Sequence, residues 1–206
     1  MPAKRTEPKR IIVGVSGASG MAYAAELLRS LRAAGVETHL VVSRTAQITL
    51  IQETDMKPAD LAALAYVAHS PADFSASISS GSFRTEGMIV APCSMRTLAE
   101  IATGCTSTLL TRAADVVLKE RRRLVLLVRE TPLHATHLRN MLAVTEMGGI
   151  IAPPVPAFYT RPQTLDDIVR HTVGRILDLF DIPHALVERW EGLRTTSRKG
   201  GRKGQN

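Results

Sequence analysis

Short apolar runs alternate with segments of helical periodicity along most of the chain. The apolar runs have the length of buried strands, and the segments between them place apolar residues three and four positions apart, as amphipathic helices do. This alternation predicts a three-layer Rossmann/flavodoxin-like α/β domain with a mostly parallel sheet covered on both faces. The predicted strands are residues 11–15, 38–42, 88–91, 124–128 and 150–152, and the predicted helices cover residues 24–31, 45–54, 59–68, 94–101, 108–119, 133–147 and 164–179.

Local signals sharpen two helix ends. Gly35 is positioned to cap the first helix at its C-terminus. Thr164, with Asp167 three residues later, resembles a capping box at the start of the last helix. By contrast, residues 75–82 are rich in Ser and Gly and weakly patterned, and the prolines of residues 153–159 predict a loop.

Ligands of parallel α/β sheets bind beyond the carboxyl ends of the strands. The loops that follow the predicted strands should therefore gather at one rim. They are residues 16–20, Ser43, residues 92–97, Arg129 and residues 153–159.

The charge of the chain is concentrated at its two ends. Of the formal net charge of +7, residues 1–10 carry +3 and residues 194–206 carry +5, which leaves −1 for residues 11–193, the body of the chain. This distribution predicts a folded domain at residues 10–193 between flexible basic tails at residues 1–9 and 194–206. Because no basic groove is expected in the body, a specific nucleic-acid partner is not expected, although the tails leave non-specific RNA contact open.

The two cysteines, Cys93 and Cys105, do not form the pattern of a disulfide framework. The start of the chain has no secretory apolar segment, and no apolar stretch is long enough to span a bilayer. We therefore expect a cytoplasmic protein with no membrane partner. Cys93 has no adjacent base in the sequence and is interpreted as a packed thiol.

Two strand-to-helix loops have the makings of an anion site. Residues 17–20 (Gly-Ala-Ser-Gly) are small, so a ligand can come close to free N–H groups at a helix start. Ser94 stands at the corresponding place after the third predicted strand. Each loop alone fits an ordinary tight turn or N-cap equally well. Together they favour one ligand with a phosphate and a polar ring, such as FMN.

Longer motifs identify the chain more closely. These motifs lie at residues 14–20, 91–95, 109–116, 118–122, 128–134 and 153–159. On them, the chain resembles the UbiX-like flavin prenyltransferases over residues 10–190. The resemblance implies that FMN binds without a metal, and that a dimethylallyl group from dimethylallyl monophosphate is joined to N5 and C6 of the reduced flavin. It also implies a UbiD-type decarboxylase as recipient of the product and a homo-oligomer, commonly a dodecamer.

The resemblance also implies roles for individual residues. Ser19, Glu53, Lys119 and Glu130 are the implied catalytic residues, with the two glutamates as acid/base groups. Thr108 departs from the asparagine common in the family. Taken singly, each charged residue fits a surface ion pair as well. The implied FMN contacts are Gly17, Ala18, Ser19, Ser43, Ser94, Met95, Arg96, Thr97, Arg112 and Arg129, and the implied donor contacts are Lys119, Arg129, Tyr159, Arg175 and Trp190.

Three other interpretations of the function start from the same sequence. His134 and His137 have a spacing that can face one metal, but no third ligand is evident. A flavin-dependent cysteine decarboxylase of the phosphopantothenoylcysteine type shares the expected fold, but residues 76–82 lack the histidine that group has before the third strand. A non-catalytic flavin-binding protein stays open, and it predicts that Lys119 and Glu130 are dispensable.

Overall fold

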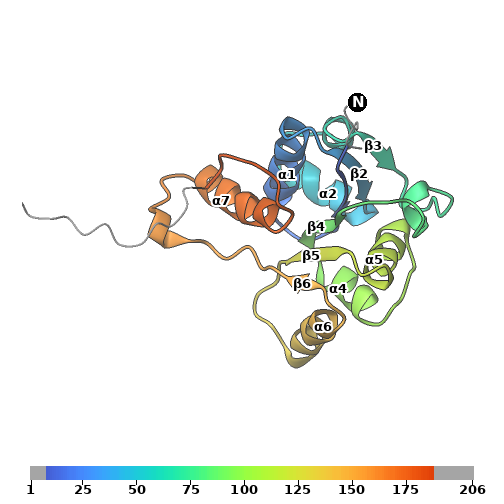
Figure 1. The fold of residues 1–206 in the computed structure, drawn as a ribbon. Helices are drawn as coiled ribbons and strands as arrows, with labels where there is room; N and C mark the ends of the chain where they lie inside the picture. The colour runs from blue at the N-terminus through green and yellow to red at the C-terminus, as the bar shows by residue number, and fades with distance from the viewer. Residues whose placement is uncertain (1–7, 188–206) are drawn as a thin grey trace, which may run out of the picture.

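The structure, a computed structural model, describes residues 8–187. It contains a six-stranded sheet in the order β3-β2-β1-β4-β5-β6, and all of its strands are parallel (Figure 1). The three-layer α/β prediction is therefore confirmed. The strands are β1 (Arg10–Val15), β2 (Glu37–Val42), β3 (Val67–His69), β4 (Gly87–Cys93), β5 (Arg123–Val128) and β6 (Ile150–Ile151).

Seven α-helices and two 3₁₀ turns accompany the sheet in the described part of the chain. None of these helices is both long and apolar enough to cross a membrane. They are α1 (Met21–Ala33), α2 (Arg44–Glu53), α3 (Pro58–Ala62), α4 (Met95–Ala102), α5 (Leu109–Lys119), α6 (Ala135–Glu146) and α7 (Leu165–Asp178), with η1 (Ser77–Ser79) and η2 (Phe158–Thr160).

Two hydrophobic cores lie on the two faces of the sheet. Successive side chains of a strand point to opposite faces. Accordingly, Ile11 and Val13 pack with α1 and α7, whereas Ile12, Met88 and Val90 pack with α4 and α5. Figure 1 shows α1, α2 and α7 on one side of the strands and α4, α5 and α6 on the other. Both faces are covered, which explains why the central strands are continuous apolar runs.

One predicted element is wrong. Residues 59–68 were expected to form a helix, but α3 ends at Ala62 and the chain continues into β3. The alanine and leucine content favours a helix locally. Pairing of β3 with the open edge of β2, where Val67 stands opposite His39, overrides that preference. The prediction of a loop at residues 153–159 holds except for η2 at its end.

Both predicted helix ends are confirmed. Gly35 follows α1 with a φ of 71°, a left-handed conformation that glycine adopts without steric cost. At α7, the Thr164 side chain accepts the Asp167 N–H, and the Asp167 carboxylate accepts the Thr164 N–H. The expected basic tails and the end of the domain at residue 193 fall mostly outside the described residues.

A buried histidine pair joins β3 to β2. His39 is only 5% exposed, and its Nδ1 lies 3.0 Å from Nε2 of His69. The ring of Phe83 meets His39 edge-on at 4.9 Å between centroids. Burial, assisted by the charges of His69 and Arg10 and opposed by that of Glu37, lowers the pKa of His39 to about 4. His39 is thus neutral in the folded protein near pH 7.

This pair makes stability depend on pH. In the unfolded chain His39 has an ordinary pKa near 6.5, so its contribution is complete above that pH and is lost as the pH falls from 6.5 toward 4. We expect the chain to lose about 2 kcal/mol more unfolding free energy between pH 7.5 and pH 5 than its His39→Gln variant does. Urea unfolding at one fixed protein concentration measures this difference. Equal losses in the two proteins would contradict it.

Candidate functional site

Strands β1 and β4 are neighbours, but the chain leaves them toward opposite faces of the sheet. After β1 it passes into α1, and after β4 it passes into α4 (Figure 1). A crevice opens at such a switch point, beyond the carboxyl ends of the two strands. The two strand-to-helix loops predicted from the sequence, residues 16–20 and 92–97, therefore border the same crevice.

A cavity of about 440 Å³ lies beside this crevice. Ser43, Ser94 and Thr108, the N-cap residues of α2, α4 and α5, all line it. The positive ends of three helix dipoles therefore meet at one place, which favours an anionic ligand. The other lining residues are Gly17, Arg44, Thr45, Pro71, Ala72, Phe74, Arg96, Thr97, Glu100, Ser107 and Leu110.

The cavity's chemistry fits FMN. Arg44 and Arg96 supply positive charge for a phosphate, while Phe74 and Leu110 supply apolar surface for a flat ring. Gly17 permits close packing of the first loop on α2, because a Cβ there would lie 2.4 Å from Cγ2 of Thr45. Volume and donor set both lie in the range of small-ligand sites.

Glu53, at the end of α2, holds the first loop in place. Its Oε2 accepts the N–H groups of Gly20 and Met21, each at 2.8 Å, at the start of α1. Gly20 has no side chain to cap that helix, so the Glu53 carboxylate does so. Burial acts to raise the pKa of Glu53, but hydrogen bonds from Ser19, Met21 and Gly20 and the charge of Arg129 bring it below its ordinary value. Glu53 is therefore ionised at neutral pH.

Arg129 and Glu130 follow β5 at the same rim. The Arg129 N–H donates to the carbonyl of Cys93, 3.1 Å away. The Arg129 charge acts to lower the pKa values of Glu53 and Tyr23, so its side chain lies near the start of α1. Glu130 is exposed, and its carboxylate accepts the N–H of Thr131. The structure thus brings Ser19, Glu53 and Arg129 together.

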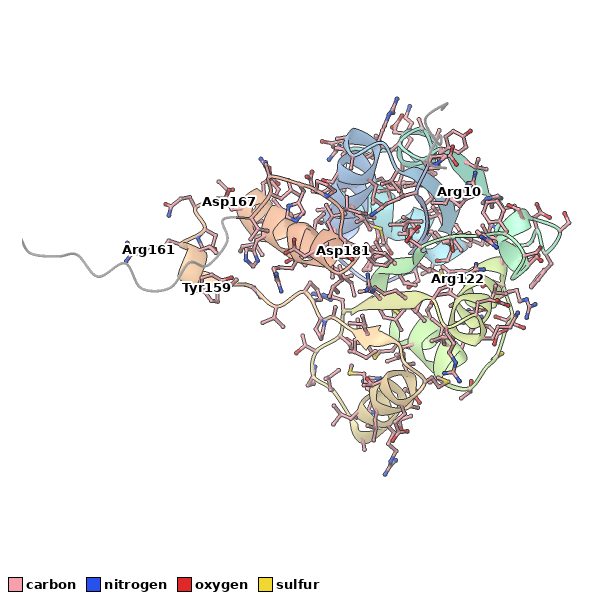
Figure 2. The ribbon with its side chains drawn as sticks, viewed as in Figure 1. Arg10, Arg122, Tyr159, Arg161, Asp167 and Asp181 are labelled. Carbon is pink, nitrogen blue, oxygen red and sulfur yellow. The ribbon has the colours of Figure 1, made fainter. Side chains whose placement is uncertain are left out.

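Tyr159 and Arg175 lie apart from this group. The segment between β6 and α7 runs away from the sheet and returns, and Tyr159 lies near its far end (Figure 2). The Tyr159 hydroxyl lies 3.2 Å from Nε2 of His171, and Arg175 forms an ion pair with Asp178. Within one chain, neither side chain lines the 440 Å³ cavity. Trp190 lies outside the described residues.

Lys119 is at the opposite edge of the sheet. It is the last residue of α5, directly before β5 begins, and it forms an ion pair with Glu120. Because β5 is six residues long, the two edges are about 20 Å apart. Lys119 instead lines a second cavity of about 590 Å³, together with Asp115. Arg112 is bonded to Asp115 and to the carbonyl of Ser79 and lines neither cavity.

Some residues of the site were not found from the sequence. Ser107 and Phe74 line the cavity but come from segments without a recognisable pattern. The sequence distinguishes Ser16 only as part of its loop. It distinguishes Thr108 only as a departure from the family, yet Thr108 is the N-cap that brings α5 to the cavity.

The structure gives little support for chemistry at Cys93 or for a metal site at His134 and His137. Cys93 is fully buried, and burial raises its pKa, as expected for a packed thiol. The rings of His134 and His137 stack with centroids 3.6 Å apart. Within residues 8–187 there is no group of three His, Cys, Asp or Glu side chains that could hold a metal ion.

Known proteins match nearly the whole chain. The model of the flavoprotein family matches residues 2–177. A probable UbiX-like flavin prenyltransferase from Streptomyces sp. (strain D7) is 57% identical over 186 residues, which cover 90% of this chain and 93% of that protein.

Solved structures of UbiX-like proteins also match the chain in fold and sequence. AnUbiX (PadA1), solved in complex with FMN and dimethylallyl pyrophosphate, has a TM-score of 0.89 and 52% identity and covers 90% of this chain and 99% of its own. A dodecameric FMN-dependent UbiX-like decarboxylase from Escherichia coli O157:H7 has a TM-score of 0.87 and 54% identity and covers 89% of this chain and 100% of its own. A phosphopantothenoylcysteine-type enzyme, PPC decarboxylase, is only 19% identical with a TM-score of 0.58, so it shares the fold alone. This chain belongs to the flavoprotein family and, within it, to the UbiX-like flavin prenyltransferases.

Proposed function

We propose that this chain transfers a dimethylallyl group from dimethylallyl monophosphate to N5 and C6 of reduced FMN. The observation that carries the proposal is the cavity where three helix N-termini meet beside the β1–β4 crevice. AnUbiX, 52% identical, was solved with FMN and a dimethylallyl donor. The reduced flavin supplies the nucleophilic ring atoms, and the protein holds both substrates and the departing phosphate.

The flavin is proposed to bind at the rim built by β1, β4 and β5. Free N–H groups at the starts of α2 and α4 suit its phosphate. The hydroxyl of Ser19 is held by the Glu53 carboxylate at the reacting edge. The residues proposed to hold FMN are Gly17, Ala18, Ser19, Ser43, Ser94, Met95, Arg96, Thr97 and Arg129. Arg112 is assigned to FMN on the resemblance alone, because within one chain it lines neither cavity.

Departure of the allylic phosphate develops negative charge, which cations stabilise best where water is excluded. Arg129 and Arg175 offer planar forks that suit phosphate oxygens, and Tyr159 offers one more donor. Glu130 is proposed to carry the proton between the substrates. Glu53 differs from it, because its lowered pKa and its backbone partners suit a fixed negative charge better than a proton carrier.

Lys119 is proposed to reach the donor from a second copy of the chain. In one chain it lies about 20 Å from the carboxyl edge of the sheet, too far for its own side chain to cross. A homo-oligomer removes this difficulty, and the related Escherichia coli protein is dodecameric. Trp190 is assigned to the donor pocket on the resemblance alone.

The product, prenylated FMN, is proposed to pass to a UbiD-type decarboxylase. The proposed compartment is the cytoplasm, where thiols such as the free Cys93 and Cys105 stay reduced. The basic ends of the sequence are proposed to be solvated tails that take no part in catalysis.

Transfer can be measured as a gain in flavin mass. Purified protein is incubated anaerobically with reduced FMN and dimethylallyl monophosphate, and in parallel with the pyrophosphate. We expect the released flavin to gain one prenyl unit with the monophosphate. Glu130→Gln should lower the rate about 100-fold or more, because the proton carrier is lost.

The matched control is Glu26→Gln, which removes the charge of a carboxylate bonded to Ser30 on α1. Its rate should stay within about twofold of the parent, since surface substitutions of this kind change little. Unmodified FMN from the parent protein, with donor and reductant verified, would refute the transferase assignment. A rate loss in Glu26→Gln equal to that in Glu130→Gln would refute the role of Glu130.

Mixed oligomers test the origin of Lys119. Lys119→Ala and Glu130→Gln chains are each expected to be nearly inactive alone. When they are co-expressed in equal amounts, about a quarter of the sites should combine an intact Lys119 from one copy with an intact Glu130 from another, provided the copies mix at random. Activity near one quarter of the parent's supports a site shared between copies. Mixtures as inactive as the separate variants would place both residues in one chain.

A further inference from the structure

Ser16 ties the two ligand loops together. It is 1% exposed and lies at the end of β1. Its Oγ donates to the carbonyl of Pro92 at 3.1 Å and accepts the N–H of Ser94 at 2.8 Å. Its own N–H also donates to the Pro92 carbonyl, at 3.2 Å. One small side chain therefore joins segments more than 70 positions apart in the sequence.

If Ser16 served only to fill space, its hydroxyl would not be needed. A methyl group would fill most of the same space, but it would leave the Ser94 N–H and one bond to Pro92 without a partner. A buried polar group without a partner costs about 1–3 kcal/mol. Relief of that cost requires the loops to move apart until water reaches the Ser94 N–H.

Gly17, which follows Ser16, and Ser94, which Ser16 binds, both line the flavin cavity. Gly17, the next residue, packs against Thr45 at the start of α2, and Ser94 is the N-cap of α4. Directly before Ser94, the carbonyl of Cys93 accepts the Arg129 N–H. The hydrogen bonds thus run without a break from the end of β1 through β4 to the end of β5. A change at Ser16 shifts each group along this line relative to the others.

We infer that Ser16 is a positioning residue for the flavin: its hydroxyl fixes the separation between the residue 17–20 loop and the start of α4. The inference rests on the proposed function for its ligand, FMN. It does not depend on the identity of the allyl donor, because Ser16 touches only the protein loops around the flavin.

The test compares Ser16→Ala, Ser16→Cys and Ser16→Thr with a control that loses a buried hydroxyl elsewhere. Thr38 serves as the control, because it is 1% exposed and its hydroxyl accepts the N–H of Tyr66 at 3.1 Å. That N–H also donates to the Thr38 carbonyl at 3.1 Å, so it keeps a partner in Thr38→Ala. Thr38 lies near the start of β2, at the edge of the sheet opposite the flavin cavity. Thr38→Ala therefore reports what the loss of a buried hydroxyl and its neighbouring methyl group, away from the flavin cavity, does to stability and to FMN affinity.

FMN affinity of the apoprotein, followed by flavin fluorescence, is the main measurement, and the melting temperature of the apoprotein is recorded beside it. We expect Ser16→Ala to weaken FMN binding about tenfold or more, consistent with one unpaired buried group. Ser16→Thr, which keeps the hydroxyl, should recover most of the affinity. Thr38→Ala should lower the melting temperature and leave FMN affinity within about twofold.

Parent-like FMN affinity in Ser16→Ala would overturn the inference, and so would an equal loss of affinity in Thr38→Ala. If Ser16→Ala does not fold, Ser16→Cys decides, because a thiol fills the space but is a weaker hydrogen-bond partner. Failure of the proposed function looks different: the parent would bind FMN and transfer no prenyl group, while the affinity order of the Ser16 variants would still stand or fall by itself.

Discussion

The rest of the site depends on the contact between β1 and β4, because the chain departs from these neighbouring strands toward opposite faces of the sheet. The loops beyond them cannot continue the sheet's backbone pairing, so their N–H groups must find other partners or a ligand. Ser16 satisfies one of them and Glu53 satisfies two, and the starts of α2, α4 and α5 are left facing one cavity. A flavin phosphate suits a place where so many donors converge.

The same topology separates two of the side chains proposed to act in catalysis. Helices in this fold run against the strands, so the end of α5 and the loop after β5 lie at opposite edges of the sheet. In the proposed site, Lys119 and Glu130 therefore come from two different copies. Exposed apolar side chains on α2 and α6, Ile48, Ile51, Leu138 and Leu142, are of the kind that subunit interfaces cover.

The sequence was sufficient for most of the fold and for the flavin rim. Continuous apolar runs predict β1, β2, β4 and β5, because strands buried on both faces have no polar side to blur the pattern. β3 was not predicted from the sequence, because its three residues at the sheet edge adopt a strand conformation through pairing with β2 and not through local preference. The hydrogen bonds that Ser16 makes with Pro92 and Ser94 have no sequence signature, because these residues become neighbours only when the chain folds. The place of Lys119 at the far edge was not predicted, because motif matching does not show at which edge of the sheet a helix ends.

A crystal structure of the protein with FMN bound tests the central claim most directly. The account predicts the flavin in the cavity between the starts of α2, α4 and α5, with its phosphate on the free N–H groups there and Lys119 of a second copy facing the same pocket. A flavin bound instead in the cavity lined by Lys119 and Asp115 of a single chain, with the first cavity empty, would contradict it.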